Sequence, residues 1–307
     1  MNKKVIKNTV TIVSFIALFI IIWLNKNTFI TGTKELGNAQ VFYVVLAIIA
    51  ALASVIPSAF AYFCLAPKPI RFHRIVTAQM ANNFTGKILP AGTGDLATMA
   101  RFLTTQSYNV IEASSIVSVN YLASFLGLMI LTIISLILSG QSVTDILRLN
   151  ISAAFYYVVL AIIGSLVLAA FIPSSSSIIR KKAREFWSVY LKAISRGWRF
   201  LLAIVASALL TLCLVFCLIF SVAAFGGNIT IAQSLIVLTI GVAAAAITPT
   251  PGSVGGAELG IMLALQAAGL DSSVALPAAL IYRFSRYWFP ILPGFIAFQI
   301  AIKKQYL

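Results

Sequence analysis

The sequence predicts an all-α integral membrane protein with about six transmembrane helices and two re-entrant hairpins of broken helices. Of its 307 residues, 61% are hydrophobic and only 9% are charged, and the mean hydropathy is +1.02. Such a composition cannot cover a soluble protein with a polar surface. We therefore predict one membrane domain over residues 1–307.

The predicted spans are continuous apolar runs. The first, 9–24, follows three lysines but ends without a small-residue cleavage site, so we expect a retained helix and not a signal peptide. The other five have at least the roughly 20 residues that a hydrocarbon core of about 30 Å requires. They are 41–66, 113–138, 151–172, 200–225 and 274–302.

Two further apolar segments, 76–103 and 231–269, are interrupted by Pro, Gly and a carboxylate. Breaks of this kind are tolerated inside a bilayer only where protein or a wet cavity surrounds them. We predict that both segments are re-entrant hairpins around a buried polar site.

The basic residues predict the topology. With cytoplasmic termini and hairpins that return to their side of entry, 15 Lys and Arg residues lie inside and 3 lie outside, a strong positive-inside bias. The net charge of +15 therefore indicates topology and contact with anionic lipid, not nucleic-acid binding. Residues 1–140 and 149–307 would then be two inverted pseudo-repeats, as in transporters with alternating access.

The two breaks carry motifs. The second contains Pro249, Pro251, Gly252, Gly255 and Glu258, and Tyr282-Arg283 follows about 25 residues later in an aromatic, Pro-containing helix. The first contains Pro90, Gly94 and Asp95, with Arg101 six residues after Asp95.

These motifs resemble the transmembrane region of lysylphosphatidylglycerol synthases, a flippase-like family of membrane proteins. Ser253 stands where the family has a second glycine, and Asp95 where it has Glu, with Arg101 three residues later than the family's Arg. The resemblance implies movement of a phospholipid between leaflets, including aminoacylated phosphatidylglycerol, in the plasma membrane of a bacterium or archaeon. Members that charge the lipid carry a soluble synthase domain, so we do not expect lysyl transfer by this chain.

Arg283 and Arg286 lie on one face of the last predicted helix, near the membrane midplane. Arginine at that depth is costly unless it is paired or hydrated. Two partners stay open and can alternate: a lipid phosphate, which guanidinium binds in a bidentate fork, and the carboxylate of Glu258.

Glu258 either caps the half-helix after Gly255 or, like Asp95, carries a proton or meets a headgroup amine. The amides of Gly252, Ser253 and Gly255 are candidates for phosphate contact. Arg101, Asn83 and Tyr282 complete the predicted substrate-binding set, whereas Lys87 is expected to snorkel to the interface.

No catalytic or metal-ligand motif and no nucleotide-binding loop is apparent, so we expect a lipid translocase without a cofactor and not an enzyme. The alternatives are an enzyme acting on lipid-linked phosphates and a transporter of a small solute. The expected partners are membrane lipids; a lipid-modifying synthase and a homo-oligomer stay open.

Overall fold

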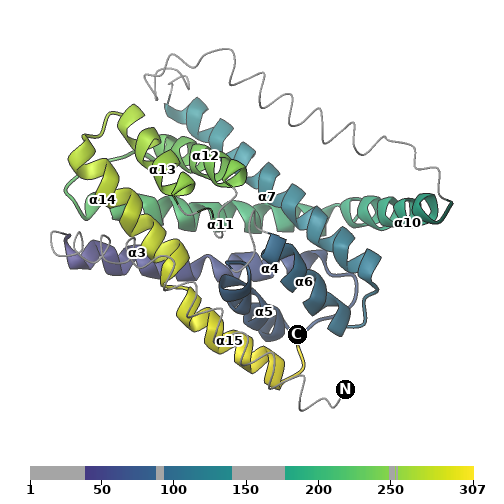
Figure 1. The fold of residues 1–307 in the computed structure, drawn as a ribbon. Helices are drawn as coiled ribbons and strands as arrows, with labels where there is room; N and C mark the ends of the chain where they lie inside the picture. The colour runs from purple at the N-terminus through teal and green to yellow at the C-terminus, as the bar shows by residue number, and fades with distance from the viewer. Residues whose placement is uncertain (1–38, 88–92, 140–176, 249–252, 254) are drawn as a thin grey trace.

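The computed structural model describes residues 39–87, 93–139, 177–248, 253 and 255–307, and this part of the chain is helical without a strand (Figure 1). The predicted spans 9–24 and 151–172 lie outside the described residues. Three helical segments are long and apolar enough to cross a membrane, namely Val41–Leu65, Val110–Leu138 and Trp198–Ala223. They confirm three of the predicted spans.

The first of these segments is bent near its middle. Helix α3 (Val41–Ala53) and helix α4 (Val55–Leu65) meet at Ser54, whose hydroxyl donates to the carbonyl of Ala51 at 2.6 Å. Pro57 lies just beyond and has no N–H for the helical ladder, which favours a kink here. Ser54, Val55 and Ser58 at this junction line the cavity described below.

The first hairpin consists of α5 (Phe72–Thr85) and α6 (Thr93–Thr105). At its closed end Gly94 lies so close to α5 that a Cβ there would be 2.6 Å from the carbonyl oxygen of Thr85. At its open end the Tyr108 hydroxyl accepts from the amide of Lys68 at 2.7 Å. The segment therefore returns to the side from which it entered, as predicted.

The second hairpin consists of α12 (Ile231–Ile247) and α13 (Gly256–Ala267). Thr230 and Gln233 form a capping box at the start of α12. The side chain of Gln233 also donates to the carbonyl of Ala268, just after α13, at 3.2 Å. This hairpin too has both of its ends on one side.

The hairpins pack against two long helical segments, α3–α4 and α11. Helix α11 (Trp198–Ala223) packs along α3 and α4, and the amide of Gln40, before α3, donates to the carbonyl of Ala224, after α11. The two segments are therefore antiparallel, and the hairpins, which follow α4 and α11 in the chain, enter from opposite ends. This arrangement suits an inverted repeat, although the division at residues 140 and 149 stays a prediction.

Helix α7 (Val110–Ser139) packs against α11, α6 and α12. At one point α7 and α11 nearly touch, because a Cβ at Gly127 would be 2.9 Å from the amide nitrogen of Ala208. Helix α10 (Ser177–Ile194) extends from the bundle beside the first part of α7 (Figure 1). It contains the basic and aromatic segment that precedes α11.

The last predicted span, 274–302, is not one regular helix. It is divided into α14 (Ser272–Arg283), a π-helical turn η1 (Phe284–Trp288) and α15 (Ile291–Lys303). Pro290, which cannot donate to a helical ladder, follows the π turn. Short π segments of this kind frequently occur at functional sites.

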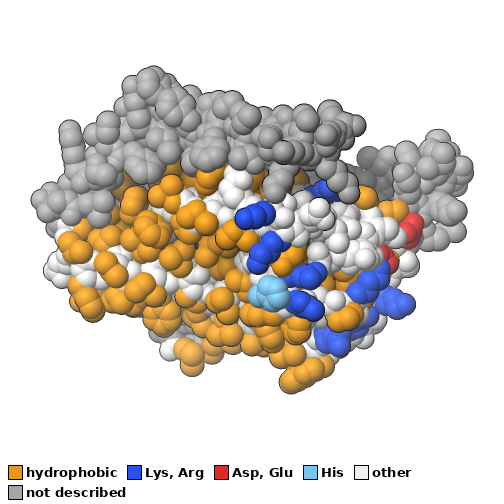
Figure 2. All heavy atoms as spheres, turned by 90° about the horizontal axis from the view of Figure 1, so that it is seen from below, with side chains coloured by type: hydrophobic (Ala, Val, Ile, Leu, Met, Phe, Trp, Pro, Cys, Tyr) orange, Lys and Arg blue, Asp and Glu red, His pale blue; other side chains and the backbone are white. Residues whose placement is uncertain are grey.

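Helix α15 packs along α5, with Gly294 against the backbone of Met80 and Phe84. Seen from below, Lys and Arg side chains gather around His73, while hydrophobic side chains spread over much of the remaining described surface (Figure 2). A basic end and an apolar flank are the surface of a membrane-embedded helical protein.

Candidate functional site

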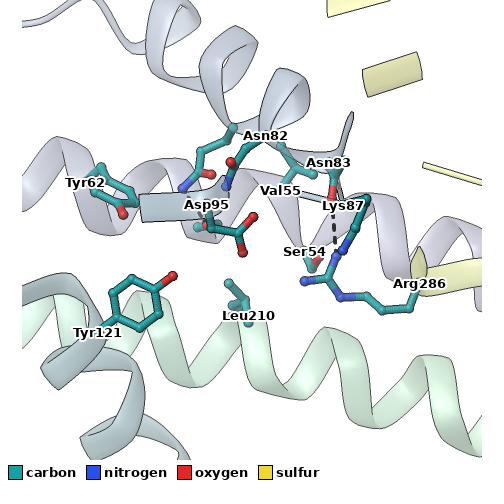
Figure 3. A pocket seen from close by; sticks show the side chains of 12 residues that line it. Ser54, Val55, Tyr62, Asn82, Asn83, Lys87, Asp95, Tyr121, Leu210 and Arg286 are labelled. Atoms are coloured by element: carbon teal, nitrogen blue, oxygen red, sulfur yellow. Dashed lines mark hydrogen bonds between the residues drawn. The ribbon is translucent and has the colours of Figure 1, made fainter. Parts of the chain in front are cut away.

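The two hairpins and the π turn border a cavity with two adjacent chambers, which share part of their wall. The inner chamber, of about 170 Å³, lies between the α3–α4 kink, α5 and α7 (Figure 3). Its wall consists mainly of hydroxyl, amide and charged side chains. The lining residues are Ser54, Val55, Ser58, Tyr62, Gln79, Asn82, Asn83, Lys87, Asp95, Tyr121, Leu210 and Arg286.

The outer chamber, of about 540 Å³, lies between the first hairpin, α11, α12, α13 and the π turn. Most of its wall is apolar, with Leu214 from α11, Leu238 from α12 and Ile261 from α13. Leu96 and Val242 also line it, yet they are 41% and 64% exposed on the molecular surface. The outer chamber therefore reaches the outside of the bundle between α6 and α12.

Four side chains border both chambers: Lys87, Asp95, Tyr121 and Arg286. In Figure 3 the Asp95 carboxylate lies between the Tyr121 hydroxyl and the Arg286 guanidinium. Arg286 donates to the Asn83 side-chain oxygen at 3.4 Å. The junction of the chambers thus brings two cations and one carboxylate together.

The position of Asp95 depends on a glycine. A Cβ at Gly86, just after α5, would collide with the Asp95 carboxylate and would be 2.8 Å from the carbonyl oxygen of Asn82. The hydroxyls of Thr85 and Thr98 are hydrogen-bonded at 2.7 Å and join the same ends of α5 and α6. The first break therefore has the small residues it needs to place a carboxylate on the cavity wall.

Glu258 and Arg283 form an ion pair beside the outer chamber. The Arg283 Nε donates to Glu258 Oε1 at 2.9 Å, and both side chains are about 10% exposed. The other carboxylate oxygen, Oε2, accepts from the amide of Gly255 at 2.8 Å, where φ is +90°. Both structural roles considered for Glu258, the ion pair and the cap, are present, so this carboxylate joins the start of α13 to the end of α14.

Tyr287, from the π turn, lies between cations of both halves of the chain. The Lys87 ammonium is 4.5 Å from the centre of its ring, and the Arg283 guanidinium carbon is 4.3 Å from it. Such distances allow cation–π attraction. The ring thus adds a cation–π contact for Lys87 and a second contact for Arg283, which is already paired with Glu258.

The structure brings together most of the predicted site residues. Asn83, Asp95, Ser253, Tyr282, Arg283 and Arg286 line the cavity, and Gly255 and Glu258 support it. Ser253 has φ of +55°, which favours glycine, and its hydroxyl donates to the carbonyl of Ala245 at 2.7 Å. Gly252 lies outside the described residues.

Arg101 is not brought into the site. It is exposed on α6 and lines neither chamber. At 3.6 residues per turn, a spacing of six residues places it about 120° around the helix from Asp95. The later position of this Arg in the motif therefore points it away from the cavity.

Several cavity residues were missed or misplaced by the sequence analysis. Lys87, expected to snorkel to the interface, instead lies at the junction of the chambers beneath Tyr287. The prediction was wrong because it rested on the residues next to Lys87 in the sequence. The Tyr287 ring, which contacts Lys87, comes from the distant π turn. Gln79, Asn82 and Asn83 have the i, i+3, i+4 spacing of one helix face, a signal that could have located the inner chamber.

We compared the chain with curated proteins and with protein-family models. The search of curated proteins finds no match. The family model for the lysylphosphatidylglycerol synthase TM region matches residues 10–294, nearly the whole chain, both hairpins and the Arg283–Glu258 pair included. This helical membrane protein with a polar cavity between two broken helices belongs to the lysylphosphatidylglycerol synthase TM region family.

Proposed function

We propose that the protein moves a phospholipid between the leaflets, with its headgroup in the cavity and its acyl chains in the bilayer. The carrying observation is that the outer chamber, bordered by the exposed Leu96 and Val242, adjoins a polar chamber with which it shares Lys87 and Arg286 as lining residues. A lipid needs such a lateral path because its tails cannot enter a polar cavity. A small solute would instead need a closed aqueous path.

The charges support an anionic headgroup. With Glu258 engaged by Arg283, the described residues at the junction of the chambers include two cations, Lys87 and Arg286, and one carboxylate, that of Asp95. Residues 88–92 and 249–252, which complete the two breaks, carry no ionisable side chain. A phosphate bound at the junction would offset the excess positive charge, and guanidinium and ammonium groups are its usual partners.

Arg286 is the better residue for a functional test than Arg283, whose loss would leave Glu258 buried without its partner. We expect Arg286→Gln to slow the movement of a labelled anionic phospholipid in proteoliposomes at least tenfold, because the phosphate loses a charged contact worth about 1.5–3 kcal/mol. The measurement is the rate at which inner-leaflet label becomes accessible to a membrane-impermeant reductant.

The matched control is Arg101→Gln, which removes the same charge from an exposed position of α6 outside the cavity. It should keep the wild-type rate. Equal rates for wild type and Arg286→Gln, with both proteins folded, would reject a headgroup path through this cavity.

A further inference from the structure

The inner chamber has a chemistry of its own, distinct from the phosphate contacts at its edge. Beyond Lys87, Asp95 and Arg286, its polar wall is made of neutral groups: three amides, two serine hydroxyls and two tyrosine hydroxyls. Its volume of about 170 Å³ is below the roughly 300–1,000 Å³ of sites for drug-sized ligands. It is therefore suited to a small polar group and not to an extended one.

One acceptor in this wall lacks a donor. The Asn82 Oδ1 is buried and accepts no hydrogen bond from the described part of the chain, although Asn82 lines the chamber. Buried polar atoms normally have a partner, and an exception calls for an explanation such as a ligand. A bound group with an O–H or N–H would supply the missing hydrogen bond once the amide turns this enclosed oxygen toward the chamber.

Donors face the same space. The Gln79 amide donates to the Ser58 hydroxyl oxygen at 2.8 Å, which leaves the proton of that hydroxyl for another acceptor. The Tyr62 and Tyr121 hydroxyls also border the chamber (Figure 3). A wall with both donors and acceptors matches a hydroxyl group, which itself donates and accepts.

An amine fits less well. An ammonium group donates only, and here it would meet Lys87 and Arg286, with Asp95 as the one carboxylate that the described residues place on the chamber wall. A lysyl ester adds two ammonium groups to a phosphate, which gives a headgroup of net positive charge in a chamber that is already positive. Like charges placed together in this way exclude a ligand.

We infer that the inner chamber receives a small, uncharged, hydroxyl-bearing headgroup whose phosphate lies at Lys87 and Arg286, in preference to an aminoacylated one. The inference rests on the proposed function for the source of the ligand, a lipid, but it concerns which headgroup binds. It narrows the substrate from phospholipids in general to anionic lipids with a polyol headgroup.

The test measures binding and not transport, so that the two proposals fail separately. Purified protein in detergent is titrated with phosphatidylglycerol, its lysyl ester and phosphatidic acid, and the bound lipid is counted by native mass spectrometry. We expect phosphatidylglycerol to bind at least tenfold more tightly than the lysyl ester.

Free glycerol phosphate, added as a competitor, should displace little lipid if the tails are required. Displacement at equal concentration would identify a soluble ligand and overturn the lipid source.

Two variants test the chamber itself. Asn82→Ala and Tyr121→Phe should each weaken phosphatidylglycerol binding about threefold to tenfold and leave phosphatidic acid, which has no polyol, unchanged. Tyr121→Phe removes a single oxygen and keeps the ring, so it serves if Asn82→Ala does not fold. Lys87→Gln should weaken both lipids, because both carry the phosphate.

Equal or tighter binding of the lysyl ester would overturn the inference and leave lipid transport standing. Equal losses for phosphatidylglycerol and phosphatidic acid in Tyr121→Phe would also overturn it, since the hydroxyl would then not contact the polyol. Selective phosphatidylglycerol binding without movement in proteoliposomes would support the headgroup assignment and reject the translocase.

Discussion

Replacing Arg283 with alanine is expected to destabilise the protein by about 3–5 kcal/mol, because it leaves the Glu258 carboxylate buried without its partner. Glu258→Ala should cost about as much, since it removes the carboxylate partner of Arg283 and the acceptor of the Gly255 amide. The measurement is the free energy of unfolding in mixed micelles, titrated with a denaturing detergent.

The double variant Arg283→Leu with Glu258→Leu separates the pair from its members. It should recover part of the loss, because no unpaired charge stays buried. The matched control is Lys68→Ala, which breaks the exposed pair of Lys68 and Glu112, 3.4 Å apart, and should cost about 1 kcal/mol or less. Wild-type stability in Arg283→Ala would contradict the buried pair.

A large functional effect is also expected from closing the opening between α6 and α12. Val242→Trp adds a large ring where α12 borders both the outer chamber and the surface. Because Val242 is 64% exposed, the larger side chain needs no repacking of the core. We expect the rate of lipid movement in proteoliposomes to fall at least tenfold while the unfolding midpoint stays near that of the wild type.

The control for this variant is Leu209→Trp, a similar change on α11 at a residue that is 51% exposed and lines neither chamber. It should move lipid at the wild-type rate. Leu96→Trp, on the opposite border of the opening, should behave like Val242→Trp. If both border variants keep full activity, the tails do not pass between α6 and α12.

Much of the fold could be predicted because burial in a bilayer leaves a strong signal. Continuous apolar runs identified the spans at 41–65, 110–138 and 198–223. Pro, Gly and carboxylates in otherwise apolar segments identified both hairpins. These signals are local, and they depend on the cost of exposing backbone polar groups to lipid.

The parts that could not be predicted depend on contacts between distant segments. The residues next to Lys87 in the sequence are typical of a membrane interface. Its place beneath Tyr287 depends on the packing of the π turn against the end of α5. Ser54 and Ser58 look like ordinary small residues of a membrane helix in the sequence. They become cavity residues because α5 and α7 pack opposite them. Arg101 is the opposite case. Its motif predicted a site residue, but its position around α6 leaves it exposed and outside the cavity.

The candidate site therefore contains residues that could be predicted from the sequence and residues that could not. Arg283, Arg286, Asp95 and Glu258 could be predicted because charges inside apolar runs are costly and few. The neutral wall of the inner chamber, with Gln79, Asn82 and Tyr121, could not, because a single amide or hydroxyl on a membrane helix is common. These neutral residues carry the inference about the headgroup.

The most direct measurement places two probes in the same proteoliposomes: a labelled phosphatidylglycerol in both leaflets and labelled glycerol phosphate trapped in the lumen. We expect the wild-type protein to expose the inner-leaflet lipid while the soluble headgroup stays inside. Escape of glycerol phosphate with the lipid label still protected would contradict it and identify an aqueous path.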